Sequence, residues 1–293
     1  MLLSPVFRLS PQSVCFVAMS CAAALADNVP PGKASAPNPA GTKAGQVRDD
    51  NGLKTKPVWC PAGDFTMGSP KDEKGRADFE AQVQVTLTDG FWLGQHEVTQ
   101  SEWQRVMQSS PWSGKDFVKE GGDYPATYVS WNDVTSFCEK FTETERDTER
   151  LPIGWKYTLP TEAQWEYACR AGTKARFSFG DDESDLTEYG WFRKNAWDAG
   201  EKYAHQVAQK KANPWGLYDM HGNVFELCRD DYTRELPGGT DPEVSAKSSL
   251  RVSRGGCWNT QAVFCRAALR AKSPQEYRKS NLGFRVALTP CAK

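Results

Sequence analysis

The stretch LPTEAQWEYACRAG, residues 159–172, contains the local signals for one helix of the fold. Thr161 offers a hydroxyl at the cap position, and Gln164 follows three residues later, so each side chain can satisfy a backbone N–H that the first helical turn leaves unpaired. Trp165 and Cys169 lie four residues apart and share one helical face. The pattern predicts a helix that starts after Thr161, ends before the closing glycine and turns Trp165 and Cys169 inward.

The same capping pattern occurs twice more, at Thr99-Gln-Ser-Glu102 and at Ser130-Trp-Asn-Asp133. After each cap, apolar residues recur at the three- and four-residue spacing of an amphipathic helix. In the second of these segments the apolar residues are Val134, Phe137, Cys138 and Phe141. We therefore expect three helices, each with one buried face.

Strand signals are short and few. Apolar residues alternate over 65–67, 83–87 and 284–288, whereas the tract 177–212 follows neither the helical nor the strand period. With 24 glycines, 18 prolines and eleven tryptophans, the composition favours many turns around aromatic packing. These features predict a loop-rich α+β fold with little regular secondary structure, formed as a single domain over residues 57–290.

The first 56 residues differ in character from the rest of the chain. Arg8 precedes an apolar run over 14–25 that ends in Ala24-Leu-Ala26, which predicts an export signal over residues 1–26. The run is about a dozen residues long, whereas a membrane-spanning helix needs roughly 20. Residues 27–56 are rich in Pro, Gly, Ala and Lys, which predicts a disordered linker. We expect an exported protein, periplasmic or secreted, without a transmembrane helix.

Charge and cysteine content limit the possible partners and the redox setting. The chain has 36 Lys and Arg against 37 Asp and Glu, and no basic block that could follow a phosphate backbone, so nucleic acid is not an expected partner. Cleavage after residue 26 would remove Cys15 and Cys21 and leave seven of the nine cysteines. In an oxidising compartment some of these should pair, and an odd number leaves at least one thiol. The sequence does not decide the oligomeric state.

Seven motifs occur in an order that resembles the formylglycine-generating enzymes, also called sulfatase-modifying factors. The resemblance covers residues 57–290 and implies the fold of that family, a single domain that is a variant of the C-type-lectin architecture. The motifs are Phe65-Thr-Met-Gly-Ser69, His96-Glu-Val-Thr99, Val129-Ser-Trp-Asn-Asp133, Leu159-Pro-Thr-Glu-Ala-Gln-Trp-Glu-Tyr167, Gly216-Leu-Tyr-Asp-Met-His-Gly-Asn-Val224, Arg254-Gly-Gly256 and Gly283-Phe-Arg285.

The resemblance also implies an activity, because members of this family oxidise a sulfatase cysteine to formylglycine with copper held by two thiolates. The first thiolate position of the family corresponds here to Thr260, and the second corresponds to Cys265. Soft thiolates select Cu(I), so a hydroxyl at position 260 leaves the pair incomplete. Cys257, at a family serine position, is the alternative partner. Cys257 and Cys265 are therefore the candidate copper ligands and catalytic residues, with Arg270 as a candidate substrate clamp.

Two of these residues also have structural interpretations. The family resemblance allows Cys265 to pair with Cys169 as a disulfide staple, which would remove Cys265 from any copper site. Closing a loop of this length would contribute roughly 4 to 5 kcal/mol in the chain-entropy model. Arg270 equally fits a core or surface ion pair. The sequence alone leaves both alternatives open.

A calcium site is expected around the turn in Gly216–Val224. The carboxylates of Asp219 and Glu226, with the carbonyl groups of Gly222 and Val224 between them, would supply the hard oxygens that Ca²⁺ prefers. The family resemblance strengthens this interpretation over that of a simple turn.

Three functions follow from these expectations. The first is a protein-cysteine oxidase whose partner is a sulfatase or another exported protein or peptide. The second is a non-catalytic, calcium-ordered module that binds a peptide or a glycan, and the third is an exported oxidoreductase that acts on a small molecule. The three histidines are too scattered in the sequence to predict a ligand trio, and no phosphate-binding loop or dinucleotide fingerprint is present.

Overall fold

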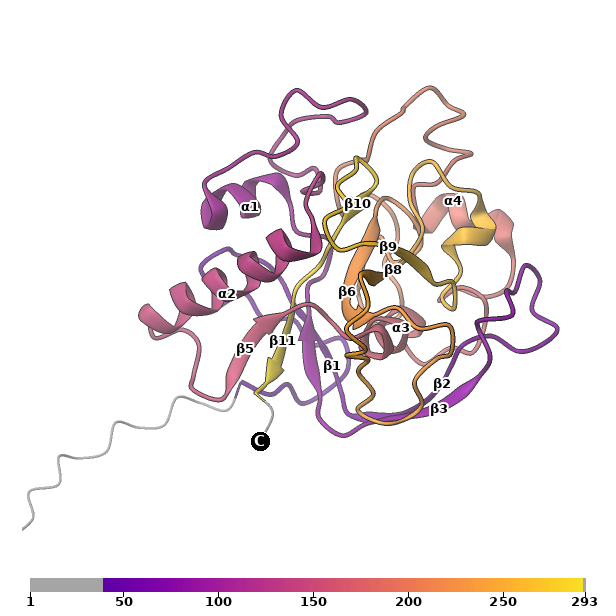
Figure 1. The fold of residues 1–293 in the computed structure, drawn as a ribbon, viewed down its shortest axis with the longest axis horizontal. Helices are drawn as coiled ribbons and strands as arrows, with labels where there is room; N and C mark the ends of the chain where they lie inside the picture. The colour runs from indigo at the N-terminus through magenta and orange to yellow at the C-terminus, as the bar shows by residue number, and fades with distance from the viewer. Residues whose placement is uncertain (1–38, 292–293) are drawn as a thin grey trace, which may run out of the picture. The chain divides into compact units, whose positions relative to one another are not determined.

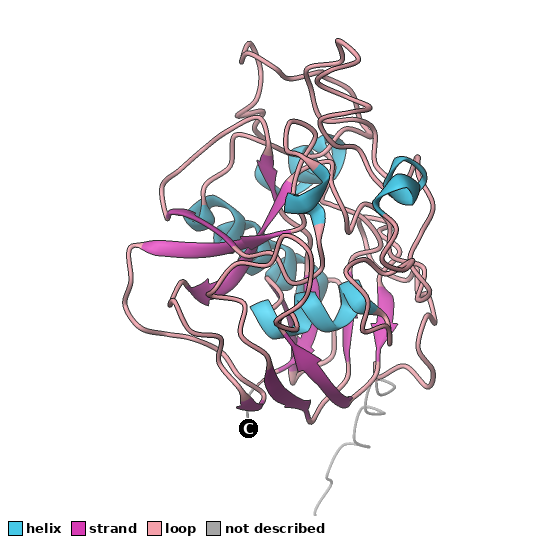
Figure 2. Ribbon diagram, turned by 90° about the vertical axis from the view of Figure 1, so that its right-hand side faces the viewer, coloured by secondary structure: helices cyan, strands magenta, loops and turns pink. Residues whose placement is uncertain are grey.

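The structure, a computed structural model, describes residues 39–291. The expected export signal over 1–26 and the first part of the expected linker lie outside the described residues. Within the described part the chain forms three small sheets, with α-helices on the same domain and long loops between them (Figure 1). This confirms the predicted α+β class and the C-type-lectin-like architecture rich in loops (Figure 2).

The first sheet joins the beginning and the end of the described chain. Its strand order is β1-β4-β11-β5, and all its pairs are antiparallel. The backbone register sets Trp59 opposite Trp92, and their rings pack at 5.1 Å between centroids. The strands are β1 (Val58–Cys60), β4 (Phe91–Leu93), β11 (Ala287–Pro290) and β5 (Trp155–Thr158).

The helices α1 (Gln100–Met107), α2 (Trp131–Asp147) and α3 (Glu162–Arg170) start where the sequence predicts, each with a complete capping box. The first two helices pack through a stacked pair of rings, Trp103 and Phe137, with centroids 5.5 Å apart. Figure 1 shows α2 beside β5, so the apolar stripe of α2 covers this sheet. The helix α3 ends one residue before the expected limit, because Ala171 already adopts a left-handed conformation with φ of 48°.

The remaining strands form the second and third sheets. The second has the order β10-β6-β8-β9, and the third has the order β2-β3-β7. The second sheet consists of β10 (Leu282–Gly283), β6 (Phe225–Asp231), β8 (Leu250–Arg254) and β9 (Ala271–Pro274). The third consists of β2 (Gly63–Met67), β3 (Val83–Leu87) and β7 (Gly239–Thr240), and the remaining short helices are η1 (Glu183–Asp185), α4 (Leu186–Tyr189) and η2 (Ala262–Cys265).

The predicted strands at 65–67 and 83–87 are confirmed, but the alternating segment 284–288 forms a strand only from residue 287. Before that point its backbone bonds to an irregular segment, because the N–H groups of Gly94 and Val98 donate to the carbonyls of Val286 and Phe284. The alternation of apolar side chains therefore extends over residues 284–286, which are not part of a regular strand.

The expected disordered linker over 27–56 is wrong for its described part. Leu53 is buried in the main core, and Val47 forms a bridge with Val58. The side-chain amide of Asn51 donates to the carbonyl of Thr55 at 2.8 Å. The ordered domain therefore begins well before residue 57, because a few buried side chains tie an otherwise polar segment to the first sheet. Across residues 39–291, no helix is long and apolar enough to cross a membrane.

Candidate functional site

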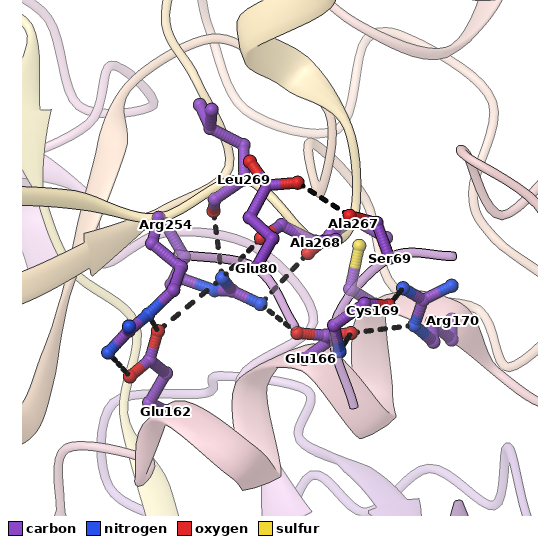
Figure 3. Close-up of polar contacts among 12 residues, drawn as sticks. Ser69, Glu80, Glu162, Glu166, Cys169, Arg170, Arg254, Ala267, Ala268 and Leu269 are labelled. Atoms are coloured by element: carbon purple, nitrogen blue, oxygen red, sulfur yellow. Dashed lines mark hydrogen bonds and ion pairs between the residues drawn. The ribbon is translucent and has the colours of Figure 1, made fainter. Parts of the chain in front are cut away.

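The candidate site lies in the loop 255–270, which connects β8 to β9. Arg254, the last residue of β8, closes the base of this loop by donating to the carbonyls of Ala267, Ala268 and Leu269 at 2.9 to 3.0 Å. Its charge is balanced by Glu166 of α3, which contacts the same guanidinium (Figure 3). A fully buried ion pair therefore fixes both ends of the loop against α3.

Thr260 and Cys265 face each other within this loop, with 3.9 Å between the threonine Oγ1 and the cysteine Sγ. The Thr260 hydroxyl accepts from the N–H of Cys257 at 3.0 Å and donates to the carbonyl of Cys257 at 2.9 Å. Gly256 is required behind the sulfur, because a Cβ there would lie 2.6 Å from Cys265 Sγ at a φ of +76°. The structure thus brings Cys257, Thr260 and Cys265 together.

Both thiols are buried and make polar contacts within the protein. The Cys257 thiol donates to Oδ1 of Asn259 at 2.9 Å, and Asn281 donates to the Cys257 sulfur at 3.5 Å. Burial raises the pKa of Cys257 to about 11. Burial also raises the pKa of Cys265, and the neighbouring Cys257 adds to that rise. Copper ligation needs thiolates, and burial opposes their formation at both cysteines, while Thr260 offers a hydroxyl in the place of a second sulfur.

Cys169 and Cys265, which the family resemblance allowed to pair, are both free in this structure. The imidazole of His221 lies between the two residues, with Nε2 3.7 Å from the Cys169 sulfur and Nδ1 donating to the Cys265 carbonyl at 2.8 Å. All seven cysteines in the described residues are free, namely Cys60, Cys138, Cys169, Cys228, Cys257, Cys265 and Cys291.

Arg270 is not a substrate clamp in this structure. Its guanidinium forms a bidentate ion pair with Glu162 at 2.6 and 2.8 Å, and donates to the carbonyl of Arg234 at 3.0 Å. The side chain is buried, so its donors are directed to protein groups rather than to a cleft. The core ion pair, the alternative that the sequence left open, is the interpretation the structure supports.

The predicted calcium ligand Glu226 is also engaged by protein groups. Both of its carboxylate oxygens accept from Arg285 at 2.6 Å, and one also accepts from the indole N–H of Trp165 at 2.6 Å. Both oxygens of this carboxylate therefore already have hydrogen-bond donors within the protein. In this structure Glu226 is held in a fully buried ion pair with Arg285.

Glu97 is a second buried acidic residue near Asp219. Both carboxylate oxygens of Glu97, and Oδ1 of Asp219, are buried without a hydrogen-bond partner. Burial, together with the nearby charges of Asp219 and Glu226, raises the pKa of Glu97 well above its usual range. Unpaired buried carboxylate oxygens are costly unless a cation compensates them. Glu97 and Asp219 thus provide unpaired oxygens of the hard type that Ca²⁺ prefers.

Sequence reasoning missed Glu97, although the motif His96-Glu-Val-Thr99 contained it. The usable signal was an acidic residue directly before Val98, whose side chain is buried. A carboxylate held by such a segment is forced inward with its neighbours. The 122 residues that separate it from Asp219 hid the pairing, because no local spacing relates the two positions.

A pocket of about 580 Å³ opens beside Thr260. The backbone N–H of Arg193 donates to the Thr260 carbonyl at 2.8 Å, so the loop after Phe192 forms one wall next to the candidate site. The helix η2, which holds Cys265 on its inner side, forms another wall. The lining residues are Lys74, Gly75, Arg176, Glu183, Phe192, Arg193, Lys194, Asp198, Gln261, Ala262 and Val263.

The fold and the thiol-bearing loop after Gly255-Gly256 define a protein of the formylglycine-generating-enzyme class. The family described as Sulfatase-modifying factor enzyme 1-like domain matches residues 43–290, and the chain belongs to this family. The formylglycine-generating enzyme of Mus musculus is 28% identical over 297 residues, covering 80% of this chain and 75% of the mouse protein.

Two further similarities show how varied this class is. The chaperone protein LppX of Paenibacillus barcinonensis is 31% identical, over 59% of this chain and 71% of that protein. The solved structure of PvdO from Pseudomonas aeruginosa has a TM-score of 0.73 and 28% identity, and covers 85% of this chain and 99% of that one. The family therefore fixes the fold of this chain, while its chemistry has to be argued from the site.

Proposed function

We propose that this protein is a ligand-binding member of the family that does not form formylglycine. The observation that carries the proposal is the Thr260 hydroxyl, which faces Cys265 at 3.9 Å in the place of a second sulfur. A neutral hydroxyl is a hard, weak donor for Cu(I), whereas two soft thiolates bind it tightly. The protonated Cys257 thiol, which donates to Asn259, does not compensate for the missing thiolate.

The residues of the loop act instead as a fixed wall for a ligand. Thr260 holds the backbone of Cys257 on one side and receives the N–H of Arg193 on the other, so the loop and the pocket beside it form one rigid unit. A preformed pocket binds with little loss of conformational entropy. The ligand is a small molecule, or a peptide or glycan segment presented by an exported partner, and the predicted export signal would place the protein in the same compartment.

Calcium is proposed as the structural cofactor. Glu97 and Asp219 would hold it through their unpaired oxygens, with the carbonyl groups of Gly222 and Val224 completing the set. When bound, the ion would neutralise two buried carboxylates and so order the turn that leads into β6. The same turn also contacts His205, whose backbone N–H donates to the side-chain oxygen of Asn223 at 2.8 Å.

The experiment uses a peptide that contains Cys-x-Pro-x-Arg, and Cu(I)-loaded protein, with aldehyde formation followed by mass spectrometry. We expect no aldehyde from the wild type and no stoichiometric Cu(I) binding. The Thr260→Cys variant restores a second sulfur beside Cys265 and should bind one equivalent of Cu(I), whereas Thr260→Ser should not. Conversion of the peptide cysteine by the wild-type protein would show that it is an oxidase and would overturn the proposal.

A further inference from the structure

We propose that the pocket beside Thr260 binds a small organic oxyanion, with Arg176 as its buried anchor. The inference rests on the proposed binding function and names the chemistry of the ligand. It depends on three features of the pocket, namely fixed walls, an excess of positive charge, and an arginine whose hydrogen-bonding capacity is only partly used.

The walls are held in place by contacts from behind the pocket. Arg266 pairs with Glu73 at 2.5 Å and with Glu80 at 2.8 Å, and donates to the carbonyl of Gly75 at 2.8 Å. Gly75 packs so closely on η2 that a Cβ would lie 2.2 Å from Cγ2 of Val263, at a φ of +82°. The loop 73–75 and η2 are therefore locked together, and the pocket does not have to form upon binding.

The lining carries more positive than negative charge. Four cationic side chains and two carboxylates face the pocket. Glu183 is paired with Arg176, and Asp198 is paired with Arg193, so both carboxylates already have partners. Lys74 and Lys194 are exposed, and no described residue gives either side chain an ion pair or a hydrogen bond. The uncompensated charge of the pocket is thus two positive charges, which attract an anion.

Arg176 is the group best suited to hold that anion. Only 7% of the residue is exposed, yet its Nε has no hydrogen-bond partner. Its Nη1 donates to the Asp181 carbonyl at 3.2 Å, and its Nη2 donates to Glu183 at 3.3 Å, both near the limit of a hydrogen bond. Arg270, by comparison, holds Glu162 at 2.6 and 2.8 Å. A planar guanidinium with spare donors is the group that binds oxyanions bidentately.

The rest of the lining indicates an organic ligand rather than a bare ion. Phe192 and Ala262 are buried apolar residues at the pocket wall, and Val263 is half-buried beside them. The volume of about 580 Å³ lies in the range of small-molecule sites, roughly 300 to 1,000 Å³. An oxyanion at Arg176, with a carbon body against the apolar wall, would use both kinds of surface.

Isothermal titration calorimetry on the full chain tests the proposal with citrate and with glucose 6-phosphate as probes, and with glucose as the neutral control. We expect at least one anion to bind, more weakly at high salt because charge attraction is screened, while glucose gives no heat. Preference for citrate identifies a carboxylate ligand, and preference for the sugar phosphate identifies a phosphorylated one. Equal binding of glucose, or binding of none of the probes, would overturn the proposal.

Variants locate the binding. The double variant Lys74→Glu, Lys194→Glu should weaken anion binding by more than about tenfold, because each change replaces attraction by repulsion. The matched double variant Lys115→Glu, Lys140→Glu alters two exposed lysines outside the pocket and should bind as the wild type does. Asp198→Asn removes a competing carboxylate and should tighten binding. Unchanged affinity in the pocket double variant would place the anion elsewhere and refute the assignment.

The anchor is tested separately, with Arg176→Lys to preserve the charge and the fold. We expect circular dichroism like that of the wild type and weaker binding, because an ammonium lacks the bidentate geometry of a guanidinium. Affinity equal to the wild type in this folded variant would remove Arg176 from the site. The binding experiments and the copper assay test separate claims. A protein that binds no anion could still lack oxidase activity, whereas aldehyde formation would overturn the proposed function whatever the anion affinities are.

Discussion

At the scale of the single residue, His221 lies between Cys169 and Cys265, which the family resemblance allowed to form a disulfide. Its Nε2 accepts from the N–H of Ser178 at 3.0 Å and from the Ser178 hydroxyl at 2.9 Å, while Nδ1 donates to the Cys265 carbonyl. Burial lowers the pKa of His221 to about 4, so the imidazole is neutral and its tautomer is set by these partners. A neutral ring in this place keeps the Cys169 and Cys265 thiols apart.

The burial of the cysteines predicts a simple labelling pattern. Six of the seven described cysteines are buried, and Cys291 alone among them is half-buried. Burial raises the thiol pKa of Cys257 to about 11, so little thiolate exists at pH 8. We expect iodoacetamide to modify Cys291 rapidly in the native protein and Cys257 only after denaturation, as measured by peptide mass spectrometry. A cysteine pair that stays unmodified in denaturant without reductant would contradict the free-thiol arrangement.

At the scale of the element, α3 is the centre of a buried ionic layer. Its Glu166 contacts Arg170 and Arg254 (Figure 3). Its Glu162 contacts Arg254 at 3.4 Å and Arg270 at 2.6 Å. One face of a nine-residue helix thus holds three arginines. Since two of these arginines flank the loop 255–270, α3 positions the candidate site as well as packing in the core.

The Glu162→Gln variant tests the importance of this layer. It would leave the buried guanidinium of Arg270 without its carboxylate, while Arg254 keeps Glu166, and it should reduce the free energy of unfolding by about 3 to 5 kcal/mol in urea denaturation. Glu188→Gln is the matched control, because Glu188 pairs with Lys211 at 3.5 Å on the surface and should change stability by less than about 1 kcal/mol. Equal effects of the two substitutions would show that α3 does not depend on its buried charges.

The elements also show which features the sequence could predict. The capping boxes at Thr99, Ser130 and Thr161 involve residues three positions apart, so local spacing was sufficient to place all three helices. The partner of Glu226 lies 59 residues away and the partner of Arg270 lies 108 residues away. No local pattern distinguishes a carboxylate paired across such a distance from one that is free to bind a cation, and this is why both residues were assigned to sites.

At the scale of the whole molecule, long-range ion pairs substitute for regular secondary structure. Arg285, just before β11, binds Glu226 of β6, and Arg266 of the site loop binds Glu80 near β3. All of these side chains are fully buried. Removing one partner of such a pair is costly, so the network specifies how the long loops connect the three sheets.

Calcium bound at Glu97 and Asp219 should stabilise the folded protein. If Glu97 and Asp219 bind Ca²⁺, the ion stabilises the native state by about 2.7 kcal/mol at a concentration 100 times its Kd, which would raise Tm by about 5 to 10 °C in a domain of this size. Chelation with EDTA should reverse the shift. Differential scanning calorimetry with and without calcium measures both changes.

Relative to the wild type, the Glu97→Gln substitution should change Tm in opposite directions without and with calcium, which makes it a sharper test than chelation alone. Without calcium the raised pKa of Glu97 already shows that its charged form is disfavoured, and the neutral amide avoids the cost of burying that charge, so the Tm of the variant should equal or exceed that of the wild type. With calcium it should gain little, because one carboxylate ligand is lost. The exposed Glu139→Gln change on α2 should respond as the wild type does. A Glu97→Gln protein that keeps the full calcium shift would rule out this carboxylate as a ligand.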